Sequence, residues 1–322
     1  MKQWLQNNLG IGAVICCSIF LTFTASPSVA QTLKPSWTSL GLTRTPPLES
    51  AQLFGSGRFS TELTEHVTPS FSSDGKHAFW SFWLPQGQSI VQLSYINRRW
   101  RDPNIIMFPG HSAIDGATFH PSEEEVFFDS NLASSPREED NWDIWKSRFS
   151  DGQWTHPERL PDEVNSDAHE VFPAVASSGN IYFMTIGTPN VYYRAEFYGD
   201  SYGYREPLPD FINEGAHYSS VYIHPDESFI IFCSDRPGGY GDGDLYVSFA
   251  DDQGEWQDPI NLGPRVNTER LDRFPKITPD GRALLFARHT KNNGPGYGQG
   301  DFYWIDASVV SELANSGTSE DS

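Results

Sequence analysis

Short runs of apolar and aromatic residues recur along this chain, and each run ends at glycine, proline, aspartate or asparagine. Extended amphipathic helix patterns are nearly absent. Runs of this length, bounded by turn-forming residues, are typical of β-strands. The pattern of hydrophobic and polar positions therefore predicts an all-β protein.

Five segments of the chain align with one another, and each has an apolar run, a polar turn of two residues and a second apolar run. The segments are PSFSSDGKHAFW (69–80), ATFHPSEEEVFF (117–128), PAVASSGNIYF (173–183), VYIHPDESFIIF (221–232) and PKITPDGRALLF (275–286). Their turns, at positions 74, 122, 178, 226 and 280, are 48, 56, 48 and 54 residues apart. A period of about fifty residues indicates a repeat architecture.

Each unit contains a third apolar run, and four of the five units continue with an aromatic residue and a proline three positions later. These pairs are Trp100 and Pro103, Trp154 and Pro157, Tyr204 and Pro207, and Trp256 and Pro259. We interpret the aromatic residue as the start of a fourth, outer strand that packs between neighbouring sheets. Four strands in about fifty residues are typical of a β-propeller blade.

The fifth unit stops after its third strand, DFYWIDA (301–307), whereas residues 47–69 parallel the linker 259–275. We expect an N-terminal strand to complete the last blade, because ring closure removes the exposed sheet edges. The fold predicted is a five-bladed β-propeller with four-stranded blades over residues 51–310. Six blades are the alternative, although residues 31–50 are too short for another repeat.

The N-terminus has a basic residue, Lys2, an apolar run over residues 9–23 and small residues leading to Ala30. This order predicts a signal peptide cleaved after Ala30, and hence a periplasmic or secreted protein. An uncleaved anchor is the alternative, but the run is shorter than the roughly twenty residues of a membrane span. Residues 31–50 are expected to form a lead-in. Residues 311–322 are expected to form a disordered acidic tail, with a short helical turn at 309–314.

The chain carries 22 basic and 42 acidic residues, a formal net charge of −20. Cleavage after Ala30 would remove one lysine and no acid, so the mature chain would be slightly more negative. Nucleic acid is not expected as a partner, because its binding depends on Lys and Arg that neutralise the phosphates. Cys233 would be the only cysteine left, so no intramolecular disulfide is expected. We also expect no membrane span in the mature chain, and a monomer.

The segments PSFSSDGKHAFW, PKITPDGRALLF and SDRPGGYGDGDLYVSF (234–249) resemble the WD40-like, TolB-type β-propeller repeat. That repeat reads approximately Pro-x-Phe-Ser-Pro-Asp-Gly, an apolar strand, and then Asp-apolar-Tyr. The resemblance covers nearly the whole mature chain, and the turns at Ser122 and Ser178 depart from it. The family includes periplasmic partner-binding propellers and propeller parts of hydrolases and lyases, so the resemblance implies the fold and leaves the activity open.

Two glycine-rich loops, RPGGYGDGDLY (236–246) and NNGPGYGQGDFYW (292–304), run directly into predicted strands. A phosphate-binding loop would lead into a helix, so the loops do not predict a nucleotide site. Asp242 and Asp244 could offer two oxygens to a divalent cation, which predicts weak binding at most, and no cofactor or metal centre is expected. An acid or amide before each third strand is interpreted as a structural turn anchor: Asp143, Asn190, Asp244 and Asp301.

In a propeller the first strand of each blade lines the central channel, so the polar residues just before these strands should gather at one mouth. They are Glu65, His66, Asp115, His169, Glu170, His217, Tyr218, Asp272 and Arg273. Three interpretations stay open: hydrogen bonding of the loops, binding of a peptide, glycan or cation, and catalysis by a carboxylate pair. No catalytic residue can be assigned, because zinc-protease, paired-cysteine and serine-hydrolase motifs are all missing from the sequence.

These observations favour a non-catalytic binding or scaffold protein of the cell envelope. It would recognise a protein or glycan partner at the channel mouth. The alternative is a carbohydrate-active enzyme, either a glycoside hydrolase or a polysaccharide lyase, that uses the channel carboxylates.

Overall fold

The computed structural model describes residues 44–61, 64–84, 87–97, 99–106, 108, 113–132, 141–290 and 298–317. Contacts divide the chain into Met1–Leu33 and Lys34–Ser322, and all described residues belong to the second unit. The predicted signal peptide and residues 31–43 of the lead-in lie outside the described residues. Within the described part of the chain, no helix is long and apolar enough to cross a membrane.

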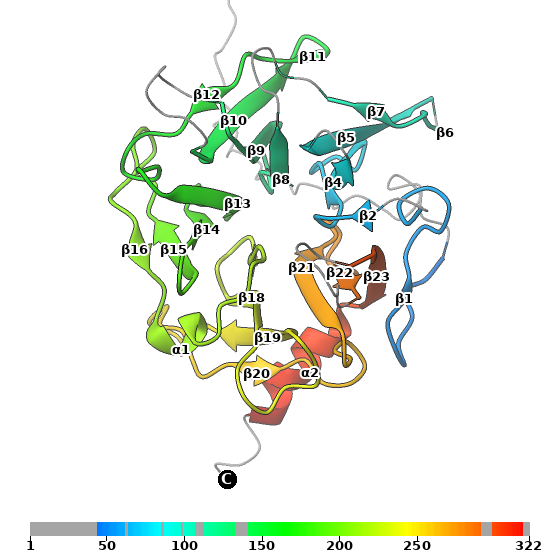
Figure 1. The fold of residues 1–322 in the computed structure, drawn as a ribbon, viewed down its shortest axis with the longest axis vertical. Helices are drawn as coiled ribbons and strands as arrows, with labels where there is room; N and C mark the ends of the chain where they lie inside the picture. The colour runs from blue at the N-terminus through cyan, green and yellow to red at the C-terminus, as the bar shows by residue number, and fades with distance from the viewer. Residues whose placement is uncertain are drawn as a thin grey trace, which may run out of the picture. The chain divides into compact units, whose positions relative to one another are not determined.

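Five antiparallel sheets surround a common axis and form a five-bladed β-propeller (Figure 1). From the axis outward, blade 1 contains β2 (Thr64–Glu65) with β3 (Ser70–Phe71), then β4 (His77–Leu84), β5 (Gly87–Ile96), and β6 (Arg99–Trp100) with β7 (Asn104–Ile105). Blade 2 contains β8 (Ile114–Phe119), β9 (Glu125–Ser130), β10 (Asp143–Ser150), and β11 (Gln153–Trp154) with β12 (Glu158–Arg159). Each blade thus has four strand positions, as predicted, although some positions are divided between two short strands.

Blades 3 and 4 are four-stranded sheets without divided positions. Blade 3 contains β13 (His169–Val175), β14 (Ile181–Ile186), β15 (Val191–Ala195) and β16 (Glu206–Pro207). After the short helix α1 (Asp210–Asn213), blade 4 contains β17 (Tyr222–Ile223), β18 (Phe229–Ser234), β19 (Asp244–Phe249) and β20 (Ile260–Asn261).

Blade 5 is built from both ends of the chain. Its inner three strands are β21 (Leu271–Ile277), β22 (Ala283–His289) and β23 (Gly300–Asp306), and its outer strand is β1 (Gln52–Leu53). Gln52 lies opposite Trp304 and Leu53 opposite Tyr303 in an antiparallel pair. Figure 1 shows β1, in blue, beside β23. This pairing confirms the predicted closure and the count of five blades.

The apolar runs of the middle strands are continuous because both faces of each blade are buried. In β9, Val126 and Phe128 pack with residues of blade 1, whereas Phe127 packs with residues of blade 3. In the same way, Phe232 and Ile231 of β18 point to opposite faces: Phe232 packs in one core cluster and Ile231 in another, the core between blades 4 and 5. Successive strand residues point to opposite faces, so each blade contributes to two inter-blade cores.

A second helix, α2 (Ser308–Gly317), follows β23. It is longer than the predicted turn at 309–314, and it occupies residues 311–317 of the predicted disordered tail. Val309 and Val310 are buried in the core between blades 4 and 5, and Leu313 packs against that core. The spacing of these three apolar residues places them on one helical face, which explains why the helix forms there. Residues 318–322 lie outside the described residues.

Candidate functional site

Three of the inner strands are interrupted by a β-bulge at the same level of the ring. The register shifts between Asp115 and Thr118 in β8, between Val171 and Ala174 in β13, and between Arg273 and Lys276 in β21. Such a bulge bends the strand and redirects its side chains. The bulge therefore divides each of these three inner strands into a segment before it and a segment after it, with side chains directed differently.

At these bulges Gly116, Phe172 and Phe274 have φ angles of 61°, 57° and 55°, in the left-handed region. That conformation is uncommon for a residue with a bulky side chain. In the two phenylalanines, hydrogen bonds to side chains of neighbouring blades stabilise this backbone conformation. The Phe172 N–H donates to the Asp129 carboxylate at 2.8 Å, and the Phe274 N–H donates to the Ser219 hydroxyl at 2.9 Å.

Four rings from four different blades meet at this level, and we call His66, Phe172, Tyr218 and Phe274 the aromatic plug. The ring centroids of Phe172 and Phe274 are 5.0 Å apart, although they come from blades 3 and 5, which are not neighbours. His66 lies 5.0 Å from Phe274, and Tyr218 lies 4.8 Å from Phe172. Three of the rings are fully buried. The aromatic plug therefore lies on the axis at the level of the bulges.

Polar groups are buried beside the aromatic plug. His66 Nδ1 lies 2.8 Å from Asp115 Oδ2, and the Ser81 hydroxyl donates to the other oxygen of Asp115. Burial lowers the pKa of His66, and the nearby Asp115 carboxylate opposes this shift only in part. Burial alone would raise the pKa of Asp115, but His66 and Ser81 outweigh it and hold that pKa below its usual range.

Arg273 is the largest charged side chain that is fully buried. Its guanidinium carbon lies 4.5 Å from the Phe274 ring centroid, its Nη1 donates to the Tyr218 carbonyl at 3.1 Å, and its Nε donates to His289 Nδ1 at 3.3 Å. Burial, and then the charge of Arg273, keep the pKa of His289 well below its usual range. A neutral His289 accepts from Arg273 at Nδ1 and donates from Nε2 to the Glu65 carbonyl at 3.0 Å.

Three of the predicted site carboxylates face away from the axis, toward the loops that precede them. Each accepts the backbone N–H and the hydroxyl of a serine or threonine four residues earlier, and we call this arrangement the loop clamp. The pairs are Glu65 with Thr61 (both 2.7 Å), Glu170 with Ser166 (2.9 and 2.6 Å) and Asp272 with Thr268 (2.8 and 3.0 Å). These carboxylates therefore stabilise the loops that lead into three blades.

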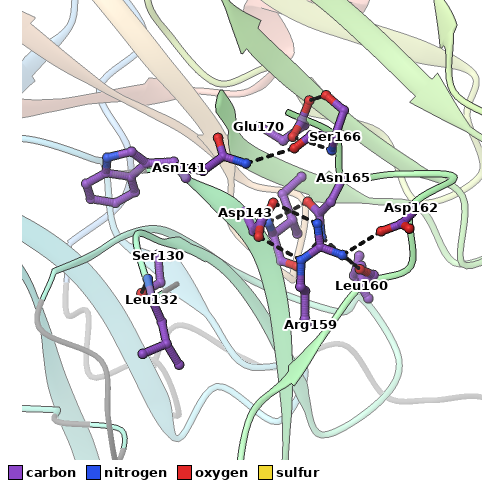
Figure 2. A network of polar contacts seen from close by, with 12 residues as sticks. Ser130, Leu132, Asn141, Asp143, Arg159, Leu160, Asp162, Asn165, Ser166 and Glu170 are labelled. Atoms are coloured by element: carbon purple, nitrogen blue, oxygen red, sulfur yellow. Dashed lines mark hydrogen bonds and ion pairs between the residues drawn. The ribbon is translucent and has the colours of Figure 1, made fainter. Parts of the chain in front are cut away.

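The loop between blades 2 and 3 shows how the loop clamp is attached to the preceding blade (Figure 2). Glu170 is turned to Ser166, and the adjacent Asn165 bonds both to the N–H (2.8 Å) and to the carbonyl (3.0 Å) of Ile144 in β10. Burial raises the pKa of Glu170, while its bonds to Ser166 oppose that shift. Asn267 likewise accepts from the N–H and donates to the carbonyl of Leu245 in β19, so the linker between blades 4 and 5 is attached to blade 4 in the same way.

The predicted turn anchors differ in their partners. Asp244 accepts from the backbone N–H groups of Tyr240 (2.6 Å) and Gly241 (3.1 Å), which closes the glycine-rich loop onto β19. Asn190 accepts from the Gly187 N–H at 3.2 Å. Asp143 instead pairs with the Arg159 guanidinium, Nε to Oδ2 at 2.7 Å (Figure 2). Burial raises the pKa of Asp301.

Cation binding at these loops gains no support from the residues that the structure describes. Nowhere among them do three or more His, Cys, Asp or Glu side chains gather in a way that could hold a metal ion. Residues 291–297 of the second glycine-rich loop lie outside the described residues. Weak cation binding at Asp242 and Asp244 stays a prediction.

The nine predicted site residues thus divide by position. His66, Asp115, Tyr218 and Arg273 are brought together at the axis. Glu65, Glu170 and Asp272 belong to the loop clamps. His169 accepts the Trp142 N–H at 3.2 Å, and burial lowers the pKa of the partly buried His217. Ligand binding by these residues stays a prediction.

A cavity of about 1160 Å³ lies at the other end of the inner strands, where they turn toward the second strands. All five inner strands line it at the same aligned position. These residues are Ser70, Thr118, Ala174, Tyr222 and Lys276. The turns that follow and α2 form the rest of the wall, including His224, Asp226, Glu227, Arg282 and Ser311. We call this space the turn-side cavity.

Lys276 is the charged residue of the aligned ring in the turn-side cavity. Its side chain is 6% exposed, and its Nζ donates to the Thr118 hydroxyl at 3.2 Å. Burial lowers the pKa of Lys276 to about 8. No acidic side chain forms an ion pair with Lys276 within the described residues. The turn-side cavity therefore has in its wall a cation that is unpaired among the described acidic residues.

Two carboxylates of the cavity wall are already engaged by the protein. Asp226 accepts from His224 and from the Ser228 N–H, and Glu227 accepts from the Tyr182 hydroxyl at 2.6 Å. Partial burial would raise both pKa values, but the hydrogen bonds dominate. They lower the pKa of Asp226 to about 2 and lower that of Glu227 as well. Both groups are ionised at neutral pH.

The sequence interpretation missed Lys276 because it considered only the residues before each inner strand. The signal was present in the aligned repeats. One position after the aligned Pro or apolar residue, four units have Ser70, Thr118, Ala174 and Tyr222, and the fifth has a lysine. An ammonium group at an inward position of a buried strand is an exception that points to a site.

The fold and the turn-side cavity define the class of protein, a five-bladed β-propeller with a pocket lined by all five inner strands. No protein-family model matches the chain, and no curated protein matches it. A putative TolB from Agrobacterium tumefaciens has 14% identity and a TM-score of 0.52, covering 77% of this chain and 79% of its own. At this identity the likeness shows the fold alone, and it agrees with the TolB-type repeat recognised in the sequence.

Two glycoside hydrolases have similar folds. A family 117 enzyme from the marine bacterium Zobellia galactanivorans has 12% identity and a TM-score of 0.52, covering 82% of this chain and 91% of its own. A GH62 hydrolase in complex with xylotriose has 10% identity and a TM-score of 0.51, covering 78% and 95%. A putative TolB and two glycoside hydrolases thus share this architecture, so the fold alone does not decide the function.

Proposed function

We propose that this protein is an exported, non-catalytic binding propeller of the cell envelope, and that its partner enters the turn-side cavity. One observation carries the proposal. The cavity is large enough for a ligand, and its wall holds a buried lysine that forms no ion pair with any acidic residue the structure describes. A concave site with an apolar wall and a few polar groups is the usual form of a ligand site.

The state of the carboxylates supports binding over glycoside hydrolysis. Glycosidases need one carboxylic acid with a raised pKa to protonate the leaving group and a second carboxylate at a defined distance. In the turn-side cavity Asp226 and Glu227 have lowered pKa values. The raised pKa values belong to groups such as Glu65 and Glu170, whose oxygens accept bonds from their own loops at the other end of the strands.

The envelope location rests on the sequence of residues 1–30, which has the order of a signal peptide. The absence of cysteine pairs does not conflict with export, because an ordinary core of about 290 residues can stabilise a domain without disulfides. N-terminal sequencing of the protein recovered from the periplasm or the medium tests this part directly. A first residue of Gln31 is expected, and retention of Met1 would contradict it.

Binding in the turn-side cavity can be tested with a bulky side chain that blocks the cavity. Ser311 is an exposed residue of α2 that lines the cavity, whereas Ser201 is equally exposed on blade 3 away from it. We expect the purified protein to bind members of a peptide or glycan array. Ser311→Trp should weaken that binding tenfold or more, and Ser201→Trp should leave it unchanged.

Two results would overturn the proposal. One is full binding by Ser311→Trp, which would locate the ligand elsewhere. The other is the release of sugar products from an arrayed glycan by the wild-type protein but not by Glu170→Ala. That outcome would favour the alternative, a glycoside hydrolase or polysaccharide lyase.

A further inference from the structure

Three hydrogen-bond donors, Lys276, Thr118 and Ser70, line the turn-side cavity at the same aligned position of three inner strands. Lys276 has three N–H donors, of which the Thr118 hydroxyl receives one. In the bonds described, Thr118 accepts from Lys276, and Ser70 accepts from the Phe119 N–H at 3.1 Å. Each hydroxyl therefore has its own hydrogen left to donate. The three side chains come from blades 5, 2 and 1 and line the same cavity.

Such a set of donors, one of them charged, matches the hydrogen-bonding needs of an oxyanion. A buried ammonium is costly unless it is paired, because burial removes its hydration. Within the described residues neither an ion pair nor a neighbouring charge compensates Lys276, which is 6% exposed. An oxyanion that enters the cavity would receive charge-assisted hydrogen bonds from the ammonium and further bonds from two hydroxyls.

The rest of the wall restricts which anion can enter. Asp226 and Glu227 stand at the turns around the cavity and are ionised. The whole chain also has a net charge of −20. An acidic polysaccharide or another polyanion would be repelled at this entrance, whereas a ligand with one anionic tip and a neutral or basic body would not.

We propose that the turn-side cavity binds the C-terminal end of a polypeptide, with the terminal carboxylate held by Lys276, Thr118 and Ser70. The proposal rests on the proposed function and specifies its ligand. Phe71, Phe119, Ile223 and Ile277 supply apolar wall for the last side chain. Asp226 lines the cavity with a side chain that is 68% exposed, so a basic residue that precedes the last one can meet its carboxylate. A cavity of about 1160 Å³ has room for a short peptide segment, since pockets for drug-sized ligands have volumes of about 300–1,000 Å³.

The experiment compares peptides that differ only at the terminal carboxylate. The full chain is offered two pools of random heptapeptides, one with free C-terminal carboxylates and the other with C-terminal amides, and captured peptides are identified by mass spectrometry. We expect at least tenfold preference for the free acids, with an apolar last residue and a lysine or arginine before it. Selected peptides are then titrated as acid and as amide.

Lys276→Met should remove the preference, so that acid and amide forms bind equally and at least tenfold more weakly than the acid binds to wild type. Lys76→Met is the matched control, because Lys76 is an exposed lysine paired with Asp74 on blade 1. Thr118→Val should reduce the preference in part, which provides a second variant if Lys276→Met fails to fold. Acid binding to wild type should also weaken above pH 8, as Lys276 loses its proton, whereas amide binding should not.

The outcomes separate this inference from the proposed function. Equal binding of acids and amides by wild type, still blocked by Ser311→Trp, would overturn carboxylate recognition and leave the cavity as the binding site. Tighter binding of oligogalacturonate than of any peptide would overturn the peptide ligand. Peptide binding that Ser311→Trp does not weaken would overturn both proposals.

Discussion

His66 Nδ1 lies 2.8 Å from Asp115 Oδ2, and this contact joins blade 1 to blade 2 beside the axis of the ring. The two side chains are 0% and 1% exposed. Neither group can exchange its partner for water, so the pair stabilises the ring only as long as both members are present.

Removal of one member should therefore be costly. We expect Asp115→Ala to lower the free energy of unfolding by about 3–5 kcal/mol, because it leaves buried polar groups of His66 and Ser81 uncompensated. Glu123→Ala is the control, since Glu123 pairs with Arg148 on the surface, where both side chains are at least half exposed. That change should cost less than about 1 kcal/mol. Urea unfolding measures both, and equal losses would contradict the prediction.

Lys276 should make stability depend on pH. Its folded pKa is about 8, below the ordinary 10.5, so the unfolded chain binds more protons between these values. Wild-type stability should thus rise between about pH 8 and 10.5, and below pH 8 the buried charge should cost about 3 kcal/mol. Lys276→Met should lack this rise and be the more stable protein at pH 7. Unfolding curves at pH 7 and 10 provide the comparison, and parallel pH profiles would disprove it.

Gly116 permits the close approach of two blades. A Cβ there would collide with the Asp129 carboxylate and lie 3.1 Å from Phe172 Cα, and the backbone has a φ of 61°. We expect Gly116→Ala to lower the free energy of unfolding by at least about 3 kcal/mol, because overpacking and backbone strain add together. Gly57 has a φ of 76° with nothing within 4 Å of a Cβ. Gly57→Ala should cost only the strain, about 1–2 kcal/mol, in thermal or urea unfolding. A similar loss in the two variants would show that the clash with Asp129 is relieved.

Leu53, the last residue of the closing strand β1, and Phe54, which follows it, have opposite environments. Phe54 is 1% exposed and packs on Phe59 and Trp304, whereas Leu53 is 42% exposed. Phe54→Ala should lower the free energy of unfolding by about 3–5 kcal/mol, and Leu53→Ala by less than about 1 kcal/mol. If Phe54→Ala unfolds like wild type, the closure of blade 5 does not limit the stability of the ring.

The blades could be predicted from the sequence because their signals are local. Apolar runs, two-residue turns and the Asp244 contact to Tyr240 all involve residues close in the chain. The state of the channel could not be predicted in the same way. It depends on Phe172 meeting Phe274 across the axis, about one hundred residues apart, and on bulges that place both in the left-handed region. The predicted site residues were therefore located beside the aromatic plug, while the cavity lies beyond it.

The pairing of β1 with β23 also fixes when the ring can be completed. Ser60, just after β1, exchanges hydrogen bonds with Phe302, 242 positions later. A strand that leaves the ribosome before any blade thus acquires its partner only when nearly the whole chain has been made. Contacts of such long sequence separation slow folding. A nascent or truncated chain that ends before β23 has an open blade edge at each end of the ring, which is a site for pairing with another chain.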